Sequence, residues 1–230
     1  MDPTHCIYIQ GCARSGNTLM RELCTHGFRN AELLKLKRNR AECSLEYVVE
    51  SLKKNRADGR VLAASRDRQT SLAMDAELLR ANPGIRVLWM LRNPPDILTS
   101  AHGGMPGKYY VEPERMIASL QLYERFKNEE QVLTVRYEDL VFEPKAVQNK
   151  IAAAFGLELL RDFADCHSHF SGIRETVRAL HSIRPIDADS VNRWKKTAVH
   201  REYINGVLKN FPQLISLSRD CGYEIAPEPA

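Results

Sequence analysis

The sequence lacks the features that would place its 230 residues in a membrane, disulfide-bonded or metal-binding class. No apolar run approaches the roughly 18 residues that cross a bilayer, and the first residues do not form a basic and then apolar leader. The six cysteines are scattered without a C-x-x-C pair, as is usual for reduced thiols. Residues 165–169 are of metal-ligand type, but no second pair follows at metal spacing. We therefore expect a cytoplasmic protein with no transmembrane segment and no metal site.

A strong excess of one charge is also missing. The chain has 33 Lys and Arg against 29 Asp and Glu, a net charge of +4, whereas nucleic-acid binders usually carry a clustered basic face. We therefore predict no nucleic-acid partner. The densest basic run, residues 35–40, fits either a solvated loop or a contact for an acidic acceptor.

What the sequence does contain is an alternation of apolar strand-length segments with helical patterns. The clearest strands are residues 7–10, 61–64, 87–91 and 132–135, and a weaker one covers 32–36. Such alternation predicts βαβ units. We expect an α/β fold of P-loop type, a three-layer sandwich with a central parallel sheet of about five strands and helices on both faces. One domain over residues 1–230 is predicted, with a core at about 5–157 and a looser C-terminal segment at about 158–226.

A loop with two glycines follows the first strand. Residues 11–18 read GCARSGNT, which matches the phosphate-binding pattern G-x-x-x-x-G-K-[ST] except that Asn17 replaces the lysine. Backbone N–H groups in such a loop, with the N-terminus of the next helix, hold anionic oxygens. The positive charge has moved to Arg14. The loop is thus predicted to bind a phosphate but not a magnesium triphosphate.

Arginines also follow the other predicted strands. Ligands of a parallel sheet bind outside the carboxyl ends of its strands, where this chain has Arg66, Arg68, Arg92 and Arg136. Arg92 stands where a P-loop NTPase needs a carboxylate for magnesium, and Asp67 is the only nearby acid that could replace it. The pattern favours a ligand with phosphates at two separate places, held by arginines and hydroxyls without metal.

Four segments resemble, in the right order, the motifs of sulfotransferases that use 3′-phosphoadenosine-5′-phosphosulfate (PAPS). Residues 13–18 (ARSGNT) are similar to P-[RK]-S-G-[TN]-[TS], departing mainly at the proline, and residues 92–100 follow R-x-P-x-x-x-x-x-S. Residues 136–140 (RYEDL) resemble a third motif. Residues 190–196 (SVNRWKK) resemble a stretch of the bacterial and carbohydrate branches. The resemblance spans most of the chain.

The resemblance implies roles for two sets of residues. One set would hold the 5′-phosphosulfate: Arg14, Ser15, Gly16, Asn17 and Thr18. The other set would surround the 3′-phosphate and the adenosine: Arg92, Ser100, Tyr137, Arg193 and Lys195. Whether Trp194 touches the cofactor or only packs stays open.

The acceptor side is less defined. Cytosolic members of the family use a histidine after the third strand, which this chain lacks, so it resembles branches that use a glutamate after the second strand. Glu42 is the first candidate for the general base, followed by Asp67 and Glu32. His102 is a further acceptor-side candidate, and Arg14 would stabilise the leaving phosphate.

These features predict metal-free, in-line transfer of a sulfuryl group from PAPS to a hydroxyl or amine. The acceptor would be a carbohydrate or another small molecule. Two alternatives stay open: a nucleotide kinase or nucleotidase with a divergent loop, and a member that binds the nucleotide without turnover. Neither the acceptor nor the oligomeric state follows from the sequence.

Overall fold

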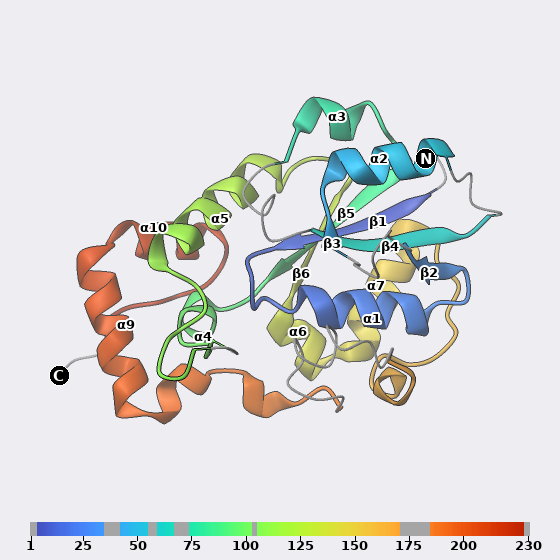
Figure 1. The fold of residues 1–230 in the computed structure, drawn as a ribbon. Helices are drawn as coiled ribbons and strands as arrows, with labels where there is room; N and C mark the ends of the chain where they lie inside the picture. Colours follow the sequence, from blue (N-terminus) through green and yellow to red (C-terminus); the bar gives the residue numbers. More distant parts are fainter. Residues whose placement is uncertain are drawn as a thin grey trace.

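The computed structural model describes residues 4–34, 42–54, 59–66, 74–102, 105–170 and 185–227, without the side chains of residues 42, 43 and 66. At its centre lies a parallel sheet (Figure 1). The strands are β1 (Cys6–Gly11), β2 (Ala31–Leu33), β3 (Glu42–Cys43), β4 (Val61–Arg66), β5 (Ile85–Leu91) and β6 (Val132–Arg136). Their order is β2-β4-β1-β5-β6, and β3 also pairs with β4.

The short strands β2 and β3 share one edge of the sheet. β2 pairs with the first half of β4 and β3 with its last two residues, while the other edge of β4 pairs with β1. The six strands therefore occupy five positions across the sheet, and the predicted parallel sheet of about five strands is confirmed. The weak strand predicted at 32–36 is shorter than expected within the described residues.

The central strands β1 and β5 are buried along their whole length. Successive side chains of a strand point to opposite faces, so a strand covered on both sides is apolar at nearly every position. Ile7 and Ile9 accordingly pack into one core layer and Tyr8 into the other. This alternation explains why both strands could be recognised from sequence.

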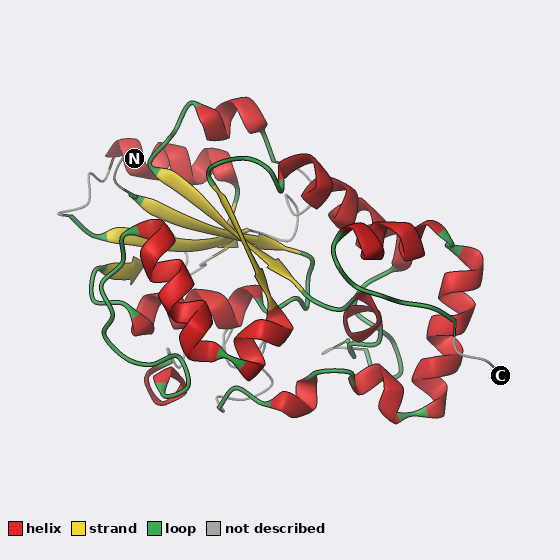
Figure 2. Cartoon of the chain, turned by 180° about the vertical axis from the view of Figure 1, so that it is seen from behind, coloured by secondary structure: helices red, strands yellow, loops and turns green. Residues whose placement is uncertain are grey.

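Helices cover both faces of the sheet, as Figure 2 shows from behind. One core layer is formed with α1 (Asn17–Gly27), α6 (Tyr137–Phe142), α7 (Pro144–Phe155) and the 3-10 helix η1 (Cys166–His169). The other is formed with α2 (Leu45–Lys54), α3 (Ala76–Arg80), α4 (Pro94–Leu98), α5 (Pro113–Phe126), α9 (Ala198–Asn210) and α10 (Gln213–Asp220). Among the described helices, none is long and apolar enough to cross a membrane.

Two short 3-10 helices, η2 (Ala188–Ser190) and η3 (Arg193–Lys196), precede α9 in the sequence. The pattern after residue 158 did not predict them, nor did it predict α10. The helix α4 ends at Leu98. Ser100 and His102 therefore belong to the loop after α4, where Ala101 forms an isolated bridge with Tyr109.

The described cysteines are free thiols, and burial changes their acidity. Burial raises the pKa of Cys166 to about 11, above the ordinary value of about 8.5 that it would regain on unfolding. The folded protein then holds the thiol proton more tightly than the unfolded chain does. Stability from this group is complete below about pH 8.5 and is lost as the pH rises towards 11.

We predict that Cys166→Ala reduces the alkaline loss of stability. Urea unfolding at pH 8 and at pH 11 should show a drop in the free energy of unfolding that is smaller in the variant, by on the order of 2 kcal/mol. The comparison is between the two drops, so the cost of the cavity left by the substitution cancels. Equal drops in the two proteins would contradict the assignment.

Candidate active site

The glycine-containing loop joins β1 to α1 at the carboxyl end of the sheet. Its backbone takes left-handed conformations at Arg14 (φ 71°) and Gly16 (φ 101°). A left-handed arginine is uncommon, because a Cβ atom crowds the following carbonyl in that region. The turn leads the chain into α1, and the first N–H groups of a helix have no partner within that helix. This is the backbone of an anion-binding loop.

The two glycines are required by contact as well as by φ. A Cβ on Gly11 would collide with the carbonyl oxygen of Met90 and lie 2.8 Å from the Ser15 hydroxyl. A Cβ on Gly16 would lie 2.8 Å from Cδ2 of Tyr137. The loop is therefore packed directly against β5 and α6, and its shape depends on the absence of both side chains.

Gly11→Ala is expected to destabilise the fold by several kcal/mol, since it combines overpacking against backbone with an unfavourable φ of 145°. Thermal unfolding monitored by circular dichroism would measure the loss. Gly206→Ala is the control, because that position in α9 has nothing within 4 Å of an added Cβ. The control should be neutral or slightly stabilising. A Gly11 variant as stable as the control would refute the packing argument.

Ser15 and Asn17 use their polar groups to hold the loop together. The buried Ser15 hydroxyl donates to the Cys12 carbonyl oxygen at 2.7 Å. The Asn17 amide donates to the carbonyl oxygens of Gly11 and Cys12, both at 3.1 Å. Asn17 thus occupies the lysine position of the phosphate-binding pattern but braces the turn instead of presenting a charge.

Arg14 and Arg92 meet beside this loop. Nε of Arg14 donates to the Ser100 hydroxyl at 2.7 Å. Arg92 donates from Nη1 to the carbonyl oxygen of Arg14 (3.0 Å) and from Nη2 to that of Ser190 (2.6 Å). The end of β5, the loop after α4 and the C-terminal part of the chain are thereby joined to the phosphate-type loop.

The electrostatics of this cluster favour an anion. Burial lowers the pKa of the Arg14 guanidinium, and the charges of Arg92 and Arg193 lower it further. The fold therefore holds Arg92 and Arg193 close enough for their positive charges to act on Arg14. An anion between them would relieve this repulsion through charge-assisted hydrogen bonds.

Tyr137 packs its ring against the Arg92 guanidinium. The ring centroid lies 4.3 Å from the guanidinium carbon, and the Tyr137 hydroxyl donates to the Ser190 hydroxyl at 3.0 Å. The same ring touches the position where Gly16 lacks a side chain. Tyr137 therefore fixes both the loop and Arg92, and its contact with an adenosine stays a prediction.

Residues 193–195 (RWK) divide into a buried tryptophan and two exposed basic residues. Trp194 is buried in the core layer with α4, α5 and α9, so its ring serves as packing. Arg193 and Lys195 are exposed on either side of it. The charge of Arg193 acts on Arg14, whereas Lys195 lies against the Trp194 ring, with Nζ 5.4 Å from the ring centroid.

Arg136 does not join the arginine cluster, although it follows a strand as Arg92 does. Its guanidinium donates to the carbonyl oxygens of Cys221 (3.2 Å) and Gly222, and it lies 4.6 Å from the centroid of the Tyr223 ring. The sequence placed four arginines at one rim, and this one instead fastens the end of the chain. The side chain of Arg66 lies outside the described part.

The candidate general bases Glu32 and Glu42 lie beside opposite ends of β4. Glu32 pairs with Leu62 near the start of β4, and its carboxylate takes a hydrogen bond from Arg60 at 3.0 Å. It therefore points to a partner away from the loop edge. The backbone of Glu42 pairs with Ser65 near the end of β4, on the side of the loop. The Glu42 side chain and the whole of Asp67 lie outside the described residues.

The His102 imidazole is linked to Arg14 through the ring of Tyr110. It stacks on Tyr110 with ring centroids 5.1 Å apart, and the Tyr110 ring centroid is 5.9 Å from the Arg14 guanidinium carbon. Sequence reasoning gave no role to Tyr110 or to Ser190, because only the fold brings their distant positions to the loop. Ser190 opens the SVNRWKK stretch, which was the one local signal for it, whereas no periodicity or motif pointed to Tyr110.

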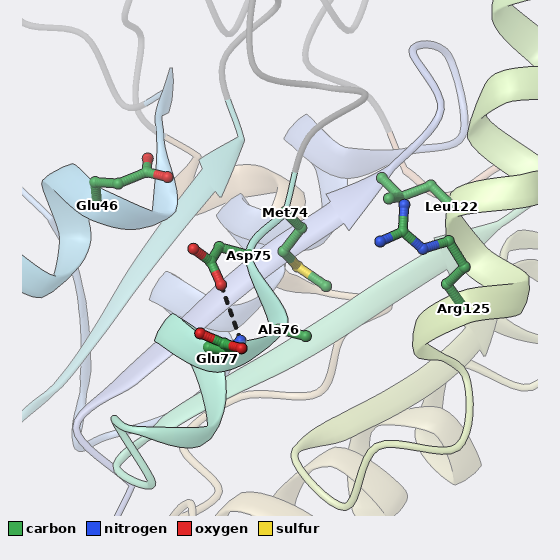
Figure 3. Close-up of a pocket in the computed structure, with 7 residues that line it drawn as sticks. All are labelled: Glu46, Met74, Asp75, Ala76, Glu77, Leu122 and Arg125. Carbon is green, nitrogen blue, oxygen red and sulfur yellow. Dashed lines mark hydrogen bonds between the residues drawn. The ribbon is translucent and has the colours of Figure 1, made fainter.

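A cavity of about 610 Å³ lies elsewhere, among α2, α3 and α5 (Figure 3). It is lined by Glu46, Met74, Asp75, Ala76, Glu77, Leu122 and Arg125. None of these residues belongs to the loop or the arginine cluster, and three are carboxylates that would repel a nucleotide phosphate. In the described part of the chain, no group of three or more metal-type ligands occurs.

Solved sulfotransferases share this fold. The sulfotransferase domain of the Synechococcus PCC 7002 olefin synthase aligns over 97% of this chain and 96% of its own, with a TM-score of 0.62 and 18% identity. The sulfotransferase domain from the curacin biosynthetic pathway aligns over 91% and 98%, with a TM-score of 0.57 and 14% identity. Mouse sulfotransferase SULT7A1, solved in complex with PAP, aligns over 90% and 84%, with a TM-score of 0.54 and 13% identity.

The chain therefore has the sulfotransferase fold, as its motifs predicted. A scan against models of protein families finds no match, and a sequence search among curated proteins finds none either. At these low identities the structural likeness establishes the architecture.

Proposed function

We propose that the protein is a sulfotransferase that uses PAPS as the sulfuryl donor. The observation that carries the proposal is the convergence of Arg14, Arg92 and Arg193 on a phosphate-type loop without its lysine. Such a site suits a nucleotide with phosphates at two places and does not need a magnesium ion. The shared fold and the four motifs support the same donor.

The residues divide between the two ends of this donor. The loop N–H groups, Gly16, Arg14 and Thr18 would hold the 5′-phosphosulfate, with Ser15 and Asn17 fixing the loop's shape. A second group would hold the 3′-phosphate: Arg92, Ser100, Arg193 and Lys195. Tyr137 would lie near the adenosine. The contact of Arg14 with Ser100 means that the two ends of the site are already linked.

The reaction is a displacement at sulfur. The acceptor oxygen or nitrogen forms a bond to sulfur, and the bond between sulfur and the phosphate oxygen breaks in line with it. The phosphate oxygen leaves with the electron pair, and the acceptor's proton passes to a base. Arg14 and the loop N–H groups stabilise the leaving oxygen. Glu42 is the first candidate for the base and Asp67 the second.

The acceptor is a hydroxyl or amine of a carbohydrate or another small molecule. The experiment is to incubate the protein and PAPS in EDTA with a panel of sugars, phenols, alcohols and amines. Equal amounts of sulfated product and adenosine 3′,5′-bisphosphate (PAP) are expected. Magnesium-dependent turnover of ATP, without use of PAPS, would favour the kinase or nucleotidase alternative. Binding of PAP without transfer to any acceptor would favour the non-catalytic one.

A further inference from the structure

We propose that Asp96 is a positioning residue that holds the RWK segment (residues 190–196) against the anion site. Asp96 lies in the first turn of α4, four residues after Arg92, and no motif of the sequence analysis assigned it a role. The inference rests on the proposed function, because the segment carries Arg193 and Lys195 to the 3′-phosphate side.

The contacts are made by both carboxylate oxygens. Oδ2 of Asp96 accepts from the backbone N–H of Asn192 at 2.8 Å, and Oδ1 accepts from that of Trp194 at 3.1 Å. Asp96 is only 3% exposed, so neither oxygen depends on water as its main partner. A buried carboxylate that accepts two N–H groups makes charge-assisted hydrogen bonds of the stronger kind.

These two bonds bracket Arg193. The residue before it, Asn192, has a left-handed backbone (φ 56°), and the residue after it is packed in the core. The backbone of Arg193 is thus fixed from both sides while its side chain is exposed. The direction in which the guanidinium leaves the chain is set by Asp96.

Arg92, which follows β5 directly, makes a second contact with the RWK segment. Arg92 donates to the carbonyl oxygen of Ser190, two residues before the Asp96 contacts begin. Arg92, which makes one of these contacts, is also proposed to bind the ligand. Asp96, which makes the others, is not. Asp96 can therefore hold the segment whether or not a ligand draws Arg92 away.

The charges of Arg92 and Arg193 both act on Arg14, and like charges repel. When no anion is bound, this repulsion would push Arg193 and its segment outwards. The Asp96 carboxylate opposes this push with hydrogen bonds and with its own negative charge. Its loss should release the segment and remove the preorganisation of the 3′-phosphate side.

Asp96→Asn tests the proposal, with Asp75→Asn as the matched control. Asp75 likewise accepts two backbone N–H groups, from Glu77 and Leu78, but it does so at the start of α3. We expect Asp96→Asn to weaken binding of PAP about tenfold, with a much smaller effect on adenosine 5′-phosphate, which lacks the 3′-phosphate. Both of its bonds are accepted by Oδ1, which asparagine keeps, so we expect Asp75→Asn to leave the fold and both affinities unchanged.

A second readout does not depend on the nucleotide. Arg193, Lys195 and Lys196 are exposed, so trypsin can report how firmly their backbone is held. Cleavage within the RWK segment should become several times faster in Asp96→Asn than in the wild type or in Asp75→Asn. Unchanged cleavage together with unchanged PAP affinity would overturn the proposal.

The design separates this proposal from the proposed function. If the wild type binds no PAP, the proposed function fails, and the cleavage comparison alone decides whether Asp96 holds the segment. If Asp96→Asn does not fold, Asp96→Ser, which keeps one oxygen acceptor, replaces it under the same two criteria. Equal losses of affinity for PAP and adenosine 5′-phosphate would show a general structural role and would also overturn the proposal.

Discussion

Replacing Arg92 by alanine should weaken binding of PAP by on the order of 100-fold. Hydrogen bonds to charged groups contribute about 1.5–3 kcal/mol each, and a guanidinium can make two to a phosphate. The substitution also removes the donors to the carbonyl oxygens of Arg14 and Ser190, so the loop and the RWK segment lose their shared partner. Isothermal titration calorimetry in a buffer with EDTA measures the effect.

Two further variants make this result specific. Arg92→Lys keeps the charge but not the planar fork, and should recover only part of the affinity. Arg80→Ala removes an exposed arginine paired with Glu129 on the surface, and should leave PAP binding unchanged. If Arg92→Ala bound PAP as tightly as Arg80→Ala, Arg92 would have no place in the anion site.

Replacing Arg14 by glycine should lower the rate of sulfuryl transfer by about 100-fold or more while preserving the fold. Loss of one donor to the developing charge typically costs this much in rate. Glycine is the right substitute because Arg14 has a φ of 71°, which glycine adopts without the strain that alanine would keep. The change also removes one of the repelling charges, so the melting temperature should stay the same or rise.

Single-turnover conversion of PAPS to PAP, with protein in excess, measures this rate without interference from product release. Affinity for PAP should fall much less than the rate, because Arg92 and the loop N–H groups stay in place. Arg14→Lys should restore part of the rate. A variant that lost stability and affinity in proportion to rate would indicate that Arg14 only maintains the loop.

Much of the fold was predictable from local pattern. β1 and β5 are buried on both faces, and that burial requires the continuous apolar runs visible in the sequence. Ser44 directly precedes α2, a position that hydroxyl residues favour, and its hydroxyl accepts from the N–H of Tyr47 at 3.3 Å. The η2 and η3 helices were not predictable, because contacts with α4 and α6 stabilise them and no repeating pattern of their own does.

The site residues were predictable where the rule for parallel sheets applies. The prediction failed where the direction of a side chain decides whether it reaches the site. Arg14 and Arg92 come together because both follow central strands. Arg136 follows an edge strand and turns instead to the chain end. Asn17 shows a third case. The motif located it correctly, but only the structure shows that both amide protons are used within the loop.

The proposed site binds a nucleotide with phosphates at two places and needs no metal ion. Titrating the wild-type protein with PAP, adenosine 5′-phosphate and Mg–ATP, the first two in EDTA, tests it most directly. One molecule of PAP should bind per chain without metal, at least tenfold more tightly than adenosine 5′-phosphate, and less tightly as salt is added. Absence of PAP binding in EDTA, or binding that appears only with Mg–ATP, would contradict it.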